Sequence, residues 1–166
     1  RNGEAIRQWM ADLADARCFR VDAETFRRVR ENFSADSVDN ATCLATIREV
    51  LDAHDYLLDP HTAVAYAAAQ NLRGENPVLI ASTAHWAKFG NNVYQAIHGI
   101  EPSGELPADV AALTGCELNK LIAEETDKHH IPAGLANLDT MQVRFTEVID
   151  NDVEAIEDAA EAFLTR

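Results

Sequence analysis

One run of four consecutive apolar residues constrains the fold of this chain more than any other feature. Val78-Leu79-Ile80-Ala81 stands between a polar turn that ends at Pro77 and the hydroxyl-bearing pair Ser82-Thr83. A continuous apolar run of this length is typical of a strand covered on both faces, as in α/β proteins. A strand also needs neighbours for its backbone groups. The chain must therefore build a small sheet from weaker strand candidates, or the sheet must be completed by polypeptide outside this sequence.

Helical periodicity dominates the rest of the chain. Apolar residues recur at helical spacing from residue 6 to residue 14, and aspartates that suit the N-cap position stand at Asp22, Asp39 and Asp59. Only short apolar pieces at 18–21 and 56–58 offer further strands. We therefore predict a helix-rich α/β fold with a small sheet around a strand at residues 77–82.

Composition narrows the class of protein. The 166 residues are 47% hydrophobic and carry a net charge of −14, which indicates a folded chain that repels nucleic acid and anionic membranes. We expect neither as a partner. Cys18, Cys43 and Cys116 form no CxxC pair or disulfide framework, which favours the reducing cytoplasm. Because the sequence starts at Arg1 rather than Met, we expect a piece of a longer chain, with an internal boundary in the Gly/Pro-rich stretch 99–107.

The first segment that carries candidate functional residues is Asp59-Pro60-His61-Thr62, which is followed by small apolar residues. Local physics favours a structural interpretation, in which Asp59 caps a helix and Pro60 occupies its first turn. A helix N-terminus also suits an anion, so a functional role for Asp59, His61 and Thr62 stays open.

The second segment follows the predicted strand directly. Ser82, Thr83, His85 and Lys88 place two hydroxyls, an imidazole and an ammonium within seven residues. Loops at the carboxyl ends of strands are where α/β proteins bind ligands. The alternative is that Ser82 or Thr83 caps the next helix and His85 has no role in binding.

A metal site is not predicted. His129 and His130 are adjacent, and neighbouring residues on a helix point in different directions, so they do not form a ligand pair. The acidic run at 150–161 is most simply a solvated helix face.

Together, the two segments resemble a known family. A DPHTAV run at 59–64, then an apolar strand, then STAHxAKF at 82–89 is the arrangement near the end of threonine synthases. The chain is similar to that family over most of its length, most specifically over 59–89. The resemblance implies that residues 1–166 form a single C-terminal segment, part of the large domain of a fold-type II pyridoxal-phosphate (PLP) enzyme.

The resemblance also implies a reaction. Threonine synthases convert O-phospho-L-homoserine and water into L-threonine and phosphate, with PLP as the electron sink. In that fold type a neutral hydroxyl faces the pyridine nitrogen, which here would be that of Thr83, with Ser82 and His85 beside the cofactor. The motif residues Asp59, His61, Thr62 and Lys88 would line the same cleft.

Two departures from the family limit what this chain can do. Trp86 stands where the family usually has Pro, and the Schiff-base lysine and the phosphate-binding loop both lie upstream of this segment. None of Lys88, Lys120 and Lys128 corresponds to that lysine. We therefore expect no catalytic residue here, no PLP bound to this chain alone, and the N-terminal remainder of the enzyme as a partner.

Two other hypotheses remain open at this point. The chain could be an acidic helical module, derived from the enzyme, that binds a protein and performs no catalysis. It could also assemble with a complementary fragment into a working enzyme.

Overall fold

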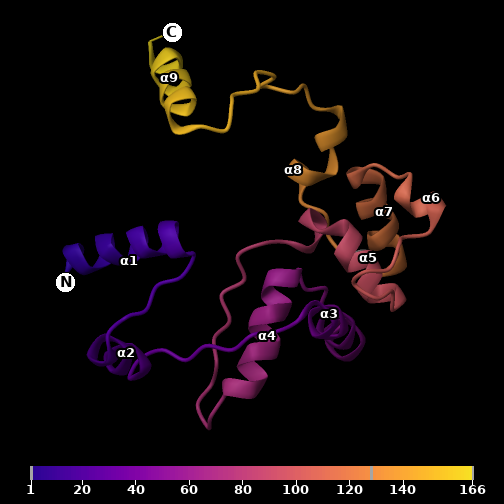
Figure 1. Ribbon diagram of the computed structural model, residues 1–166. Helices are drawn as coiled ribbons and strands as arrows, with labels where there is room; N and C mark the ends of the chain where they lie inside the picture. The colour runs from indigo at the N-terminus through magenta and orange to yellow at the C-terminus, as the bar shows by residue number, and fades with distance from the viewer. Residues whose placement is uncertain (1, 128, 166) are drawn as a thin grey trace. The chain divides into compact units, whose positions relative to one another are not determined.

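The computed structural model describes residues 2–127 and 129–165, and within them helices are joined by extended connections (Figure 1). The helices are α1 (Gly3–Ala16), α2 (Ala23–Arg30), α3 (Asn40–His54), α4 (Pro60–Leu72), η1 (Trp86–Lys88), α5 (Gly90–His98), α6 (Ala108–Ala111), α7 (Gly115–Glu125), α8 (Ala133–Ala136), η2 (Leu138–Thr140) and α9 (Val153–Leu164). Arg1, Lys128 and Arg166 lie outside the described residues.

The sequence predicts aspartate caps at the starts of α2, α3 and α4, and all three are present. The side chain of Asp22 accepts a hydrogen bond from the Thr25 amide at 2.9 Å, and that of Asp39 from the Thr42 amide at 2.7 Å. Asp59 caps α4 in the same way. Each carboxylate satisfies amides that have no partner within the helix and lies at the positive end of its dipole.

The chain divides into two compact units, Arg1–Ala108 and Asp109–Arg166. In the first unit α3 packs against α4 and α5 (Figure 1). Ile47 of α3 and Val93 of α5 are fully buried there, and Trp86 of η1 joins them in the core. The first turn of α4 contributes the buried residues Thr62 and Ala63, and η1 contributes Trp86 and Ala87. The two segments singled out by the sequence are therefore each anchored in this core by buried residues.

The second unit is built around α7. A capping box begins this helix: the Thr114 hydroxyl accepts from the Glu117 amide at 3.3 Å, and the Glu117 carboxylate accepts from the Thr114 amide at 2.9 Å. Such a box satisfies two unpaired amides at once. Helix α7 contacts α8 and η2, and Ile122 on its inner face is fully buried. The predicted boundary at 99–107 stays a prediction.

The predicted small sheet is wrong. Within residues 2–127 and 129–165 there is no β-strand, and residues 77–82 run as an extended connection instead. Leu79 is 97% exposed and Val78 is also exposed, although a doubly covered strand would bury both. The physical reason is the absence of pairing, because the weak candidates at 18–21 and 56–58 lie in connections between helices and form no strand that could pair with this segment.

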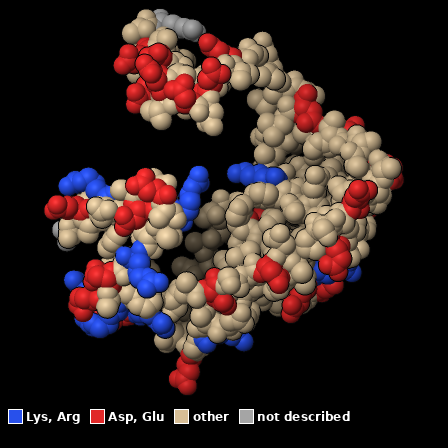
Figure 2. All heavy atoms as spheres, in the orientation of Figure 1, with Lys and Arg blue, Asp and Glu red and all other residues tan. Residues whose placement is uncertain are grey.

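Large apolar side chains are exposed elsewhere as well, including Phe33, Phe145, Val148 and Leu164. Figure 2 shows Asp and Glu side chains gathered on α9, where the sequence predicts a solvated acidic face. Among the described helices, none combines the length and the hydropathy that crossing a membrane requires.

Candidate functional site

The Asp59 carboxylate is the centre of the candidate site. It is 3% exposed, and its Oδ1 accepts hydrogen bonds from the amides of His61 at 2.9 Å and Thr62 at 3.2 Å. Its Oδ2 accepts from the Thr62 hydroxyl at 2.5 Å. A buried carboxylate is costly unless it is fully hydrogen-bonded, and these three donors meet that requirement.

Thr62 connects this helix start to the second segment. Its hydroxyl oxygen lies 3.0 Å from the hydroxyl oxygen of Ser82. Thr62 and Ser82 lie 20 residues apart in the sequence, so the two predicted motifs meet in space through this contact.

The loop from Ser82 to His85 presents Thr83 at the surface, with an exposed side chain. The loop ends where His85 caps η1: its Nδ1 accepts a hydrogen bond from the Ala87 amide at 3.2 Å. Because Nδ1 is an acceptor, a neutral His85 carries its proton on Nε2. The cap of this short helix is therefore His85, not Ser82 or Thr83.

His61 stands on the outer side of the same helix turn. Its ring packs edge-on against Phe89 with ring centroids 4.8 Å apart, and its Nδ1 lies 3.6 Å from Oδ1 of Asp59. The imidazole is mostly exposed, as is Lys88 at the end of η1. Both side chains are thus available at the surface beside the loop.

Cys43 is a neighbour of the site that the sequence analysis did not single out. Its buried thiol donates a hydrogen bond to the Pro60 carbonyl at 3.4 Å. Burial, and then the negative charge of Asp59, raise the pKa of the Cys43 thiol. The thiol thus stays protonated and serves as a packing and hydrogen-bonding group, not as a nucleophile. The sequence gave no indication of the contact between Cys43 and Pro60.

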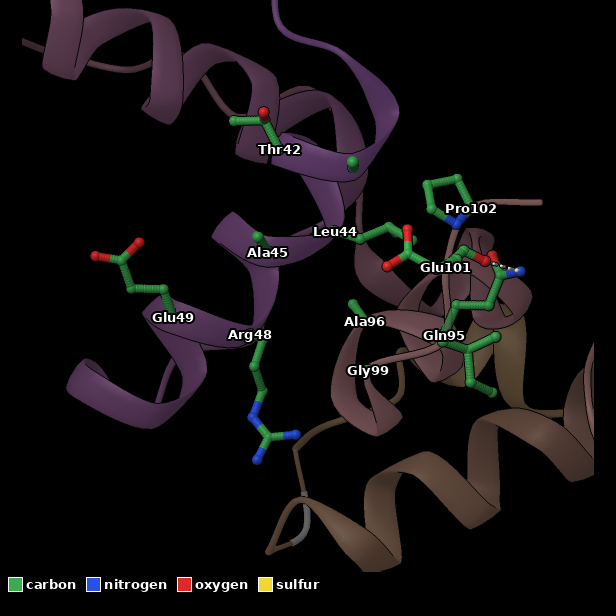
Figure 3. A pocket seen from close by; sticks show the side chains of 12 residues that line it. Thr42, Leu44, Ala45, Arg48, Glu49, Gln95, Ala96, Gly99, Glu101 and Pro102 are labelled. Carbon is green, nitrogen blue, oxygen red and sulfur yellow. Dashed lines mark hydrogen bonds between the residues drawn. The ribbon is translucent and has the colours of Figure 1, made fainter. Parts of the chain in front are cut away.

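Among the cavities lined by described residues, two lie in the first unit, and Thr83 lines neither of them. One, of about 570 Å³, lies between the C-terminal half of α4 and the segment that carries Val78 and Ile80. The other, of about 710 Å³, lies between α3 and the C-terminal end of α5 (Figure 3). Arg48 lines the larger one, where it forms an ion pair with Asp52 and donates to the Ile97 carbonyl. Because both partners are part of the fold, we assign Arg48 a structural role.

Comparison with known proteins shows the family to which this chain belongs. The structure is similar to an X-ray structure of PLP-bound threonine synthase from Brucella melitensis, with a TM-score of 0.64 and 26% identity over 98% of this chain and 29% of that one. The described residues therefore have the fold of part of a PLP-bound enzyme. The protein-family model for the C-terminal part of threonine synthase matches residues 62–159. This chain belongs to that family.

Curated relatives agree with this assignment. Human threonine synthase-like 1 is 32% identical over 98 residues, which cover 58% of this chain and 13% of that protein. Threonine synthase of Saccharomyces cerevisiae is 25% identical over 173 residues, covering 99% of this chain and 30% of the yeast protein. The chain thus spans less than a third of these relatives.

Proposed function

We propose that this chain is the C-terminal part of a threonine synthase, the enzyme that forms L-threonine and phosphate from O-phospho-L-homoserine and water. The support is the family match over residues 62–159, together with the meeting of the two motif segments at Thr62 and Ser82. In this proposal the segment contributes binding residues, and the N-terminal remainder of the enzyme completes the active site.

Thr83 is the residue we propose to face the pyridine nitrogen of PLP. When bound, the cofactor supplies an electron sink for negative charge at the substrate carbons. Thr83 fits this role because its hydroxyl is small, uncharged and exposed at the end of an extended segment. A neutral hydroxyl does not force a proton onto the ring nitrogen as a carboxylate would. His85, held by its cap to η1, would lie beside the same ligand.

The chain's own lysines support an inactive isolated segment. Lys88 and Lys120 are exposed side chains on η1 and α7, and Lys128 lies outside the described residues. A Schiff-base lysine works best in a desolvated pocket, and the exposed positions of Lys88 and Lys120 provide none. We therefore propose that this lysine belongs to the N-terminal remainder.

The exposed apolar residues support the same partner. Val78 and Leu79 lie on the extended segment just before the candidate site, and exposing large apolar side chains in water is unfavourable. Coverage by the N-terminal remainder would bury them next to Thr83. The active site would then form where the two parts of the enzyme meet.

Borohydride reduction tests whether the Schiff-base lysine lies in this segment or in the N-terminal remainder of the enzyme. The isolated chain is mixed with PLP, reduced, and analysed by peptide mass spectrometry, with the full-length enzyme treated in parallel. We expect one stoichiometric adduct in the full-length enzyme, at a lysine outside this segment, and only scattered, substoichiometric labelling of the isolated chain. A stoichiometric adduct on Lys88 would overturn the proposal. Phosphate release from O-phospho-L-homoserine should be detected for the full-length enzyme alone.

A further inference from the structure

We infer that Asp59, Thr62 and Ser82 form a hydrogen-bond relay and that this relay positions the loop that carries Thr83. The relay has a fixed proton order, meaning that the donor and the acceptor of each hydrogen bond are determined. This inference rests on the proposed function, because the position of Thr83 matters only if Thr83 meets a ligand. Asp59 and Thr62 are positioning residues in this scheme, since neither needs to touch the ligand.

The proton order follows from counting donors. The Asp59 carboxylate is an acceptor on both oxygens, with two amides on Oδ1 and the Thr62 hydroxyl on Oδ2. Thr62 has one hydroxyl proton, and the 2.5 Å contact commits it to Asp59. The 3.0 Å contact between Thr62 and Ser82 must then be donated by Ser82. The order therefore runs from Ser82 through Thr62 to Asp59.

This order separates the two hydroxyls of the loop. The proton of Ser82 is used inside the protein, so Ser82 can offer a ligand only its oxygen lone pairs. Thr83 is the next residue, and its side chain is exposed. Of the two hydroxyls, that of Thr83 is therefore the one suited to donate a hydrogen bond to a ring nitrogen. The relay thus assigns the two neighbours different tasks: Ser82 anchors the loop and Thr83 binds.

The loop is held at two points. Ser82 is hydrogen-bonded to the first turn of α4, and His85 accepts a hydrogen bond from the Ala87 amide at the start of η1. Thr83 and Ala84 lie between these points. A loop fixed at both ends loses less entropy on binding than a mobile one, so the relay pre-organises Thr83.

Backbone order parameters of the 166-residue chain test the relay without any cofactor. Thr62→Val removes the hydroxyl and keeps the branched shape, and Ser82→Ala removes the other partner. We expect the amide order parameters of Thr83 and Ala84 to fall from about 0.8 to about 0.6 or below in each variant. Because both substitutions break the same contact, the double variant should fall no further.

Two matched controls separate positioning from general damage. Thr62→Ser keeps a hydroxyl and should restore the wild-type values. Thr46→Val removes another buried hydroxyl, which donates only within its own helix to the Thr42 carbonyl at 2.8 Å, and should leave the loop unchanged. Unchanged order at Thr83 in Thr62→Val, or an equal loss in Thr46→Val, would overturn the relay. Neither result bears on whether PLP binds, so the two proposals fail separately.

Discussion

The hydroxyl oxygens of Thr62 and Ser82 lie 3.0 Å apart and join the first turn of α4 to the loop before η1. Both residues belong to motifs that the sequence marks separately, and their contact makes the two motifs one site. The buried Asp59 carboxylate holds Thr62 from the other side. The stability of this arrangement can be measured one residue at a time.

Asp59 should contribute more to stability than an ordinary helix cap. Asp59→Ala removes the acceptor for three hydrogen bonds in a buried position, so we expect a loss of roughly 2–3 kcal/mol in the free energy of unfolding. Asp59→Asn keeps one acceptor oxygen for the amides and should lose about half as much. Urea denaturation followed by circular dichroism gives these values. The exposed cap variant Asp39→Ala, as a control, should cost clearly less than Asp59→Ala, because water can take the place of the lost acceptor.

Truncation to alanine should reduce the free energy of unfolding strongly at Ile47 and very little at Leu79. In the isolated chain, Ile47 is fully buried, so Ile47→Ala should cost about 2–5 kcal/mol. Leu79→Ala in the same chain should stay within about 0.5 kcal/mol, because the side chain is 97% exposed there. Tryptophan fluorescence during urea unfolding reports on the first unit, where Trp86 is buried. A cost above 2 kcal/mol for Leu79→Ala would mean that residues 77–82 are buried after all.

Arg48 should stabilise the first unit by linking α3 to the end of α5. Arg48→Met removes the hydrogen bond to the Ile97 carbonyl, at the negative end of the α5 dipole, and should cost roughly 1–2 kcal/mol. Arg27→Met is the matched control, because Arg27 forms only exposed ion pairs with Glu24 and Glu31. Such pairs contribute little, so the control should change the free energy of unfolding far less than Arg48→Met does. Equal losses would contradict a structural role specific to Arg48.

The second unit should lose stability in acid. The amide of Thr114, and then its side chain, lower the pKa of Glu117 from its ordinary value of 4.5. A hydrogen bond from the Thr114 side chain is the chief cause that lowers the pKa of Asp139 from 3.8. Because each folded-state pKa is below the unfolded one, the contribution is present above the unfolded value and is lost as the pH falls through the folded one.

Chemical denaturation between pH 6 and pH 3, followed by NMR signals of α7, measures this effect. Glu117→Gln and Asp139→Asn should each flatten the decline, since each removes one titrating group. A decline of unchanged steepness in both variants would show that other carboxylates cause the acid sensitivity.

The sequence predicted the local features well and the non-local ones poorly. The caps at Asp22, Asp39 and Asp59 were predictable because a cap is decided within one helix turn. The sheet around residues 77–82 was wrong because a strand depends on partners elsewhere in the chain, which an apolar run does not specify.

The candidate site also was predictable in its local features and not in its non-local contacts. The motifs and the exposed loop follow from the order of residues and from the family resemblance, but the contact between Thr62 and Ser82 exists only through the packing of α4 beside the loop. The burial of Cys43 against Pro60 likewise depends on how α3 packs against α4. Helical spacing predicts which face is buried and does not predict what that face meets.

The affinity of the full-length enzyme for PLP, measured for Thr83→Ala and Thr83→Ser, tests the central claim most directly. If the Thr83 hydroxyl meets the pyridine nitrogen, Thr83→Ala should raise the dissociation constant by about 5- to 10-fold, the effect of one lost hydrogen bond. Thr83→Ser and the exposed control Ser34→Ala should stay within about twofold of wild type. An unchanged dissociation constant in Thr83→Ala would contradict the claim.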